Sequence, residues 1–160
     1  MRYTITTLAL AVSSPAFAQE VSLPQSVEWG ASAEAVEGAL EGKCADGLTV
    51  REISPPFLPN ASEQVQIDCA GLDHFGAPRF AEFVIGDDRL QMVWVMVEPE
   101  EEDSAIAAMR EAYGQPSAES ELFIAFESHR TAWRHEPAEF LYYSPELSEA
   151  MSAWFASAAG

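Results

Sequence analysis

Residues 80–97 read FAEFVIGDDRLQMVWVMV, and this stretch decides the fold class of the chain. It contains two apolar runs, Phe80–Ile85 and Leu90–Val97, which have the β-branched and aromatic content of strands. The connection between them, Gly86-Asp87-Asp88-Arg89, is short, polar and rich in turn residues. The sequence therefore predicts a β-hairpin whose two strands pair antiparallel.

The second strand of this hairpin is apolar on both of its faces. Alternation along a strand places Leu90, Met92, Trp94 and Met96 on one face and Gln91, Val93, Val95 and Val97 on the other. Two apolar faces are typical of a central strand in a sheet that is covered on both sides. We therefore interpret the Met and Trp side chains as core residues rather than as the lining of a ligand groove.

Outward from the hairpin, helix and strand signals alternate along the chain. Helices are expected after the N-cap Ser32, from Pro99 onwards, and from Pro145 after the N-cap Ser144. Further strands are expected over Leu48–Ile53, Val65–Cys69, Glu121–Phe126, Thr131–His135 and Glu139–Tyr143. Because short turns join most strands, the sequence predicts an α+β fold in which helices pack on one face of an antiparallel sheet.

The last of these helices carries an apolar stripe at helical spacing. The stripe consists of Leu147, Ala150, Met151, Trp154 and Phe155. Side chains at these intervals lie on one side of a helix, so this helix must dock on another element.

A short pattern occurs twice in the chain. Phe75-Gly76-Ala77-Pro78 and Tyr113-Gly114-Gln115-Pro116 share an aromatic-Gly-x-Pro order, and each precedes a strand-rich segment. This repetition indicates two related helix–strand units, residues 29–97 and 99–160, within a single domain over residues 19–160.

The first eighteen residues have the layout of a bacterial secretory signal peptide. Met1 and Arg2 give a positive start, an apolar run follows, and Ala16-Phe17-Ala18 is a small-x-small cleavage site. Cleavage is expected between Ala18 and Gln19. The residue directly after the cleavage site is not a Cys, so it could not accept a lipid. The apolar run is shorter than the roughly 20 residues that cross a bilayer. We expect a periplasmic protein with no transmembrane segment in its mature form.

Composition excludes some classes of function. The chain has 160 residues, and its eight Lys and Arg stand against 26 Asp and Glu, giving a net charge of −18. Hydrophobic residues make up 48 %, which is typical of a globular domain rather than a disordered chain. Affinity for nucleic acid depends on Lys and Arg at phosphates, so no nucleic-acid partner is expected. An acidic surface favours a basic partner.

Export determines how the two cysteines are interpreted. Cys44 and Cys69 are the only cysteines in the chain, and an oxidising compartment favours joining them. Redox motifs usually hold their cysteines two residues apart, and here the spacing is wide. The sequence therefore predicts a structural disulfide.

Catalytic motifs are sparse in this sequence. It has no Gly-x-Ser-x-Gly elbow and no Ser-x-x-Lys, and Lys43 is its single lysine. The adjacent pair Asp73-His74 is a weak alternative site, which we expect in a loop because glycines flank it. These observations indicate a protein that is not an enzyme.

Metal motifs are sparse as well. His129 and His135 are expected on one face of a continuous strand, a pair too small for a zinc site. The acidic run Glu98–Asp103 lacks the alternate spacing of a calcium loop, and its carboxylates suit a helix start instead. No metal and no cofactor are expected.

Arg130 and Arg134 share the opposite face of the same expected strand. Two guanidinium groups on one face could form an anion site or contact a partner. Alternatively, they neutralise nearby acids such as Glu127, Glu136 and Glu139. Both interpretations remain open at the level of sequence.

Several of these features resemble a known type of module. Trp29-Gly30-x-Ser32 before a helix, and Tyr113-Gly114-x-Pro116 before strands that contain Trp133 and Leu141, resemble segments of small exported proteins of Gram-negative bacteria. The β-lactamase-inhibitor protein and the small lipoprotein of the outer-membrane assembly machine have modules of this type. The resemblance implies a helix followed by an antiparallel sheet, acting in binding or scaffolding. It carries no catalytic residue over to this chain.

Two functions therefore follow from the sequence. The preferred one is a non-enzymatic periplasmic binding or envelope-accessory module that acts through protein–protein contact, with a basic periplasmic or envelope protein as its partner. The alternative is a small periplasmic hydrolase that uses Asp73, His74 and an acidic partner residue.

Overall fold

The structure is a computed structural model that describes residues 21–158. The predicted signal peptide and its cleavage site at Ala18 and Gln19 lie outside the described residues. No helix in residues 21–158 is both long and apolar enough to span a membrane.

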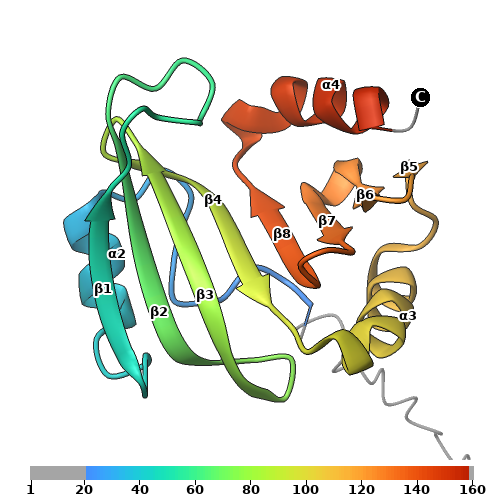
Figure 1. The fold of residues 1–160 in the computed structure, drawn as a ribbon, viewed down its shortest axis with the longest axis horizontal. Helices are drawn as coiled ribbons and strands as arrows, with labels where there is room; N and C mark the ends of the chain where they lie inside the picture. Colours follow the sequence, from blue (N-terminus) through green and yellow to red (C-terminus); the bar gives the residue numbers. More distant parts are fainter. Residues whose placement is uncertain (1–20, 159–160) are drawn as a thin grey trace, which may run out of the picture.

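One antiparallel sheet organises the described residues (Figure 1). Its strands are β1 (Gly47–Glu52), β2 (Gln64–His74), β3 (Ala77–Gly86), β4 (Arg89–Met96), β5 (Ala118–Glu119), β6 (Phe123–Phe126), β7 (Thr131–Arg134) and β8 (Glu139–Tyr143). They lie side by side in the order β1-β2-β3-β4-β8-β7-β6-β5. The helices are α2 (Ala33–Leu40), α3 (Glu102–Tyr113) and α4 (Ser148–Ala158), and 3-10 turns cover Pro99–Glu101, Glu127–His129 and Pro145–Leu147. The α+β class is therefore confirmed.

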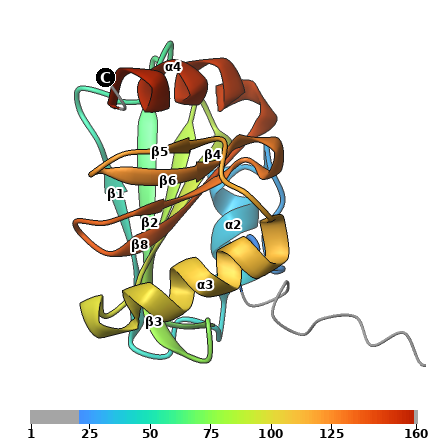
Figure 2. The same cartoon turned by 90° about the vertical axis from the view of Figure 1, so that its right-hand side faces the viewer.

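The helices are divided between the two faces of the sheet. Val36 of α2 and Met109 of α3 are buried in one core, with Phe83, Val95 and Trp133 of the sheet. In Figure 2, α3 and α4 lie on opposite sides of strands β5–β8. The expectation that the helices pack on one face is corrected, because α4 buries its apolar stripe in a second core on the other face. That second core includes Val84, Met92, Phe123, Leu141, Tyr143, Met151 and Phe155.

The hairpin that decides the fold is present. Asp87 and Asp88 have φ angles of 48° and 57°, the left-handed conformation that a tight two-residue turn requires. The carboxylate of Asp88 also accepts a hydrogen bond from a residue that is distant in the chain. Asp88 Oδ1 accepts a hydrogen bond from Ala33 N (3.0 Å), which supports the start of α2 beside the N-cap Ser32. The turn thus fixes both the sheet and the first helix.

A β-bulge changes the faces predicted for β4. Ile85 pairs with Leu90 and Val84 pairs with Met92, so Gln91 is an extra residue in β4. As a result, Leu90 lies in the same core as Val93 and Val95, whereas Met92 and Trp94 lie in the other core. The predicted alternation is wrong for Leu90, although β4 is a central strand covered on both faces.

Two other local predictions are corrected by the backbone. Asp73 and His74 belong to β2 rather than to a loop, because β2 continues past a bulge at Gly71. The expected continuous strand through His129 and His135 is shorter, since Arg130 adopts φ 51° after a 3-10 turn. Strand β7 therefore begins only at Thr131.

The chain shows the same element order twice. A helix precedes a four-stranded antiparallel meander in α2–β4 and again in α3–β8, and the two meanders meet where β4 pairs with β8. The division into units 29–97 and 99–160 stays a prediction. Within the first half, a disulfide joins Cys44 to Cys69 of β2, as predicted.

Candidate functional site

The sheet leaves part of one face without a helix. In Figure 1, α2 lies behind strands β1–β4, whereas α4 lies above β8 and β6, so no described helix crosses the front of β1–β4. We call this front face of β1–β4 the open face. Phe80 and Met96, which are 36 % and 38 % exposed, lie on β3 and β4.

A groove lies where the open face meets α4 and the loop after β1. Its volume is about 540 Å³. The residues that line it are Phe57, Leu58, Pro59, Gln66, Glu82, Met92, Trp94, Arg134, Leu147, Ala150, Met151 and Trp154. We call it the aromatic groove, because three large aromatic side chains are among these residues.

Two exposed aromatic side chains border the aromatic groove. Phe57 is 56 % exposed and Trp154 of α4 is 39 % exposed, although burial would stabilise both. Trp154 rests against Phe123, with ring centroids 4.5 Å apart in an edge-on arrangement. An exposed aromatic pair beside a concavity is a feature of protein-interaction surfaces.

Backbone hydrogen bonds, rather than packing, hold Phe57 in its place. The side-chain oxygen of the buried Gln64 accepts from Phe57 N and Leu58 N, both at 3.0 Å. Asp87 Oδ1 accepts from Ser62 N (2.9 Å) and Glu63 N (3.0 Å) at the other end of the loop. The loop is therefore fixed at both ends, and the backbone at Phe57 has little conformational freedom to lose on binding.

The floor of the groove contains a cation–π pair. The guanidinium of Arg134 lies 4.3 Å from the centroid of the Trp94 ring. Arg134 also forms an ion pair with Glu139, its neighbour across β7 and β8. Glu139 is buried (1 % exposed), so the ion pair is screened little by water.

Glu139 is the most perturbed carboxyl group beside this floor. Its burial raises its pKa from 4.5 to about 7, although Arg134 opposes the shift and Glu82 adds to it. The aromatic groove therefore has a titratable group beneath it whose charge changes near neutral pH.

A polar ladder runs along the open face beside the groove. Gln66 Nε2 donates to Asp68 Oδ1 (2.8 Å) and to Glu82 Oε1 (2.7 Å). Arg51 on β1 donates through Nε to Asp68 Oδ2 (2.8 Å). These bonds hold Glu82 at the groove with its side chain 29 % exposed.

Most of the basic side chains are neutralised within the molecule. Ion pairs with carboxylates engage Arg51, Arg79, Arg89, Arg110 and Arg134. Because the chain has 26 acidic and eight basic residues, the acids left over dominate its surface. The molecule as a whole therefore has a negative electrostatic field.

The predicted pair Asp73 and His74 does not form a reactive site. His74 is buried, and its Nε2 lies 3.0 Å from Tyr142 Oη. Tyr142 Oη donates to Val21 O (2.9 Å), so His74 Nε2–H is the donor to Tyr142. Burial, followed by Arg79, lowers the pKa of His74 to about 4. Asp73 is exposed on the opposite side of the strand, so this geometry does not favour the hydrolase alternative.

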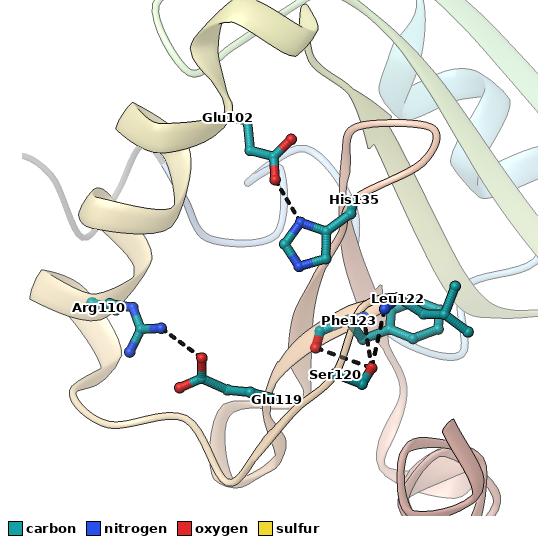
Figure 3. Close-up of polar contacts among 7 residues, drawn as sticks. All are labelled: Glu102, Arg110, Glu119, Ser120, Leu122, Phe123 and His135. Atoms are coloured by element: carbon teal, nitrogen blue, oxygen red, sulfur yellow. Dashed lines mark hydrogen bonds and ion pairs between the residues drawn. The ribbon is translucent and has the colours of Figure 1, made fainter. Parts of the chain in front are cut away.

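The other two histidines have separate structural contacts. The His129 ring lies 4.7 Å from the Tyr113 ring, between centroids. His135 Nδ1 contacts Glu102 of α3, as Figure 3 shows. In the same view Arg110 pairs with Glu119, so one hydrogen bond and one ion pair connect α3 to the segments that follow it. Among the described residues, no three His, Cys, Asp or Glu side chains converge as metal ligands would.

Arg130 and Arg134 have different surroundings. Arg134 lines the aromatic groove and neutralises Glu139, one of the acids named for this role. Arg130 follows a 3-10 turn in a left-handed conformation and does not line the groove. Of the two predicted contact residues, the structure places only Arg134 at the candidate site.

Sequence reasoning missed most of the residues around the groove. Phe57 lies between Pro56 and Pro59, and a large aromatic residue in a proline-rich loop is a signal that could have identified it. No local sequence pattern marks Glu82 as a groove residue, because its position depends on strand pairing. Trp154 was assigned to a buried stripe, but its side chain borders the groove.

Comparison with known proteins yields no relative. No protein-family model, no curated protein and no solved structure matches this chain. The function must therefore be argued from the groove itself.

Proposed function

We propose that this protein is a non-enzymatic, exported binding module of the periplasm or envelope, which acts through contact with another protein. The aromatic groove is the observation that carries the proposal. It combines Trp94, Trp154 and Arg134, and Trp and Arg are enriched among the residues that dominate binding energy at protein interfaces.

The partner is a basic protein that places an apolar side chain in the aromatic groove. Glu82 is partly exposed at the groove and supplies a carboxylate for a cation of the partner, while the guanidinium of Arg134 is directed to Glu139 and to the Trp94 ring. The net charge of −18 also attracts a basic protein over distances of about 10 Å at ordinary salt concentrations.

Affinity capture from an envelope extract tests this proposal with matched variants. Phe57→Ala combined with Trp154→Ala removes both exposed aromatic side chains of the groove. Leu122→Ala is the control, because Leu122 is 54 % exposed but does not line the groove. We expect the wild type and the control to retain the same basic protein, and the double variant to lose it.

Salt provides an independent readout of the same capture. Raising the salt from about 0.05 M to about 0.5 M shortens the screening length, so retention of a basic partner should fall. Equal retention by the wild type and the groove variant would contradict the proposal, provided that both are folded at the temperature of the capture.

Export is part of the proposal and has its own test. The disulfide between Cys44 and Cys69 is compatible with an oxidising compartment. N-terminal mass analysis of the protein from a periplasmic fraction should find a chain that starts at Gln19 and carries no lipid. A retained Met1, or a protein found only in detergent extracts, would contradict the export proposal.

A further inference from the structure

Within residues 21–158, no other strand pairs with the outer edge of β1. β1 pairs with β2 on one side, and all six of its residues are exposed. The opposite edge strand, β5, has only two residues. Proteins usually keep edge strands short or block them, because the outward N–H and C=O groups can pair with another strand. β1 is long enough to offer such pairing.

A second groove lies beside the start of this edge, on the side of the sheet away from the aromatic groove. It lies between β1 and α2, and its volume is about 520 Å³. The residues that line it are Glu34, Glu37, Gly38, Leu40, Glu41, Gly42, Cys44 and Leu48. We call it the edge groove.

Two aliphatic side chains of β1 are exposed on the α2 side. Leu48 and Val50 pair with Cys69 and Ile67, which belong to the core that α2 covers. They are 36 % and 44 % exposed, so a strand added beside β1 could bury both.

Two carboxylates of α2 and that of its C-cap residue Glu41 line the edge groove. Glu34, Glu37 and Glu41 recur at helical spacing, and no ion pair among the described residues engages them. The nearby Lys43 donates instead to the carbonyl of Ala39 (2.6 Å). The helical wall of the groove is therefore negatively charged.

We propose that β1 accepts an extended segment of a basic partner as an additional strand, which pairs with the free edge of β1 beside the edge groove. The backbone of the segment hydrogen-bonds to the outward groups of β1. Its alternate side chains are apolar and cover Leu48 and Val50, and basic side chains reach the carboxylates of Glu34, Glu37 and Glu41. Strand addition of this kind takes its affinity from the main chain and its specificity from alternate side chains.

Charge decides between this occupant and a second copy of the chain. Two copies joined through β1 would each bring a net charge of −18, and both would bring the carboxylates of α2 to the same edge. Like charges in such proximity oppose association. A basic segment removes this repulsion, and the site is separate from the aromatic groove.

The test uses a defined probe, an acetylated and amidated decapeptide of alternating Val and Lys. Its comparison is a peptide of the same composition in scrambled order. Binding is measured by calorimetry, and the bound strand is located by amide hydrogen exchange of the full protein. We expect the alternating peptide to bind in preference to the scrambled one and to slow exchange in Gly47–Glu52.

Protein variants separate this site from general electrostatics. The triple variant Glu34→Gln, Glu37→Gln and Glu41→Gln should weaken binding by about tenfold, since each exposed charge contributes modestly. The matched control neutralises three exposed acids elsewhere, with Glu98→Gln, Glu100→Gln and Asp103→Asn, and should leave the affinity unchanged.

Each remaining outcome overturns the proposal. These outcomes are an absence of binding, equal affinity for the scrambled peptide, equal loss in both triple variants, and protection outside β1. The double variant Phe57→Ala and Trp154→Ala should bind the peptide as the wild type does. Failure of the aromatic-groove proposal is therefore distinguishable from failure of this one.

Discussion

The guanidinium of Arg134 lies 4.3 Å from the centroid of the Trp94 ring, and this contact joins β7 to β4 across the intervening strand β8. The same arginine forms an ion pair with the buried Glu139. An arginine held by both contacts loses few rotamers when a partner docks. It therefore gives the aromatic groove a rigid floor.

The first prediction concerns Glu139 and pH. Its pKa is raised from 4.5 to about 7 by burial, so the folded protein binds a proton that the unfolded chain releases in this range. The free energy of unfolding should therefore contain a contribution that falls as pH rises from 4.5 to 7. Glu139→Gln removes it. The measurement is urea unfolding at pH 4.5, 5.5 and 7, in which the variant should gain stability relative to wild type as pH rises. A stability difference that stays constant with pH would contradict a raised pKa for Glu139.

His74 should contribute with the opposite sign. Its pKa is lowered from 6.5 to about 4, so the unfolded chain binds the extra proton between these values. The free energy of unfolding gains a contribution that rises with pH from 4 to 6.5 and is lost on acidification. The free energy of unfolding of His74→Gln minus that of the wild type should fall as pH rises from 4 to 6.5. For Glu139→Gln the same difference rises with pH. Tyr142 keeps a polar neighbour in His74→Gln. If the difference for His74→Gln does not change with pH, the pKa of His74 is not lowered in the folded protein.

The disulfide should contribute strongly to stability. Joining Cys44 to Cys69 closes a loop of sequence separation 25, worth about 3.5 kcal/mol in the chain-entropy model. Reduction should lower the melting temperature by roughly ten degrees or more. The double variant Cys44→Ser and Cys69→Ser should melt at the lower temperature with or without reductant. Free thiols in protein from a periplasmic fraction would contradict the prediction.

The last helix should be essential to the fold. Leu147, Met151 and Phe155 are 3 %, 4 % and 2 % exposed, so truncation after Tyr143 uncovers the second core. Circular dichroism should show loss of cooperative unfolding. Phe155→Ala should cost about 3–5 kcal/mol, whereas Trp154→Ala should cost about 1 kcal/mol because that ring is partly exposed. A truncated chain with an unchanged melting temperature would contradict the packing of α4.

Local chemistry made much of the fold predictable from the sequence. The turn at Asp87 and Asp88, the N-cap at Ser32 and the helix stop at Gly114 each depend on residues close in the chain. The bulge at Gln91 was not predictable in this way. The residues of β4 have the composition of a regular strand, and the extra residue becomes evident only when β4 pairs with β3.

The candidate site was less predictable because its residues come from distant segments. Phe57, Glu82 and Trp154 belong to a loop, β3 and α4, and the groove exists only once β4 and β8 pair. Arg134 was identified from composition, since basic residues are scarce. Trp154 was misplaced, because helical spacing cannot distinguish the centre of a buried stripe from its rim.

Photo-crosslinking in living cells tests whether the aromatic groove contacts a partner. A photoreactive phenylalanine analogue replaces Trp154, and in a matched control it replaces Ala107, an exposed residue of α3 on the opposite side of the sheet. We predict one crosslinked adduct with a basic envelope protein from position 154 and none from position 107. The same adducts from both positions, or none from position 154 in a protein that is folded and exported, would contradict the claim that the aromatic groove binds a partner.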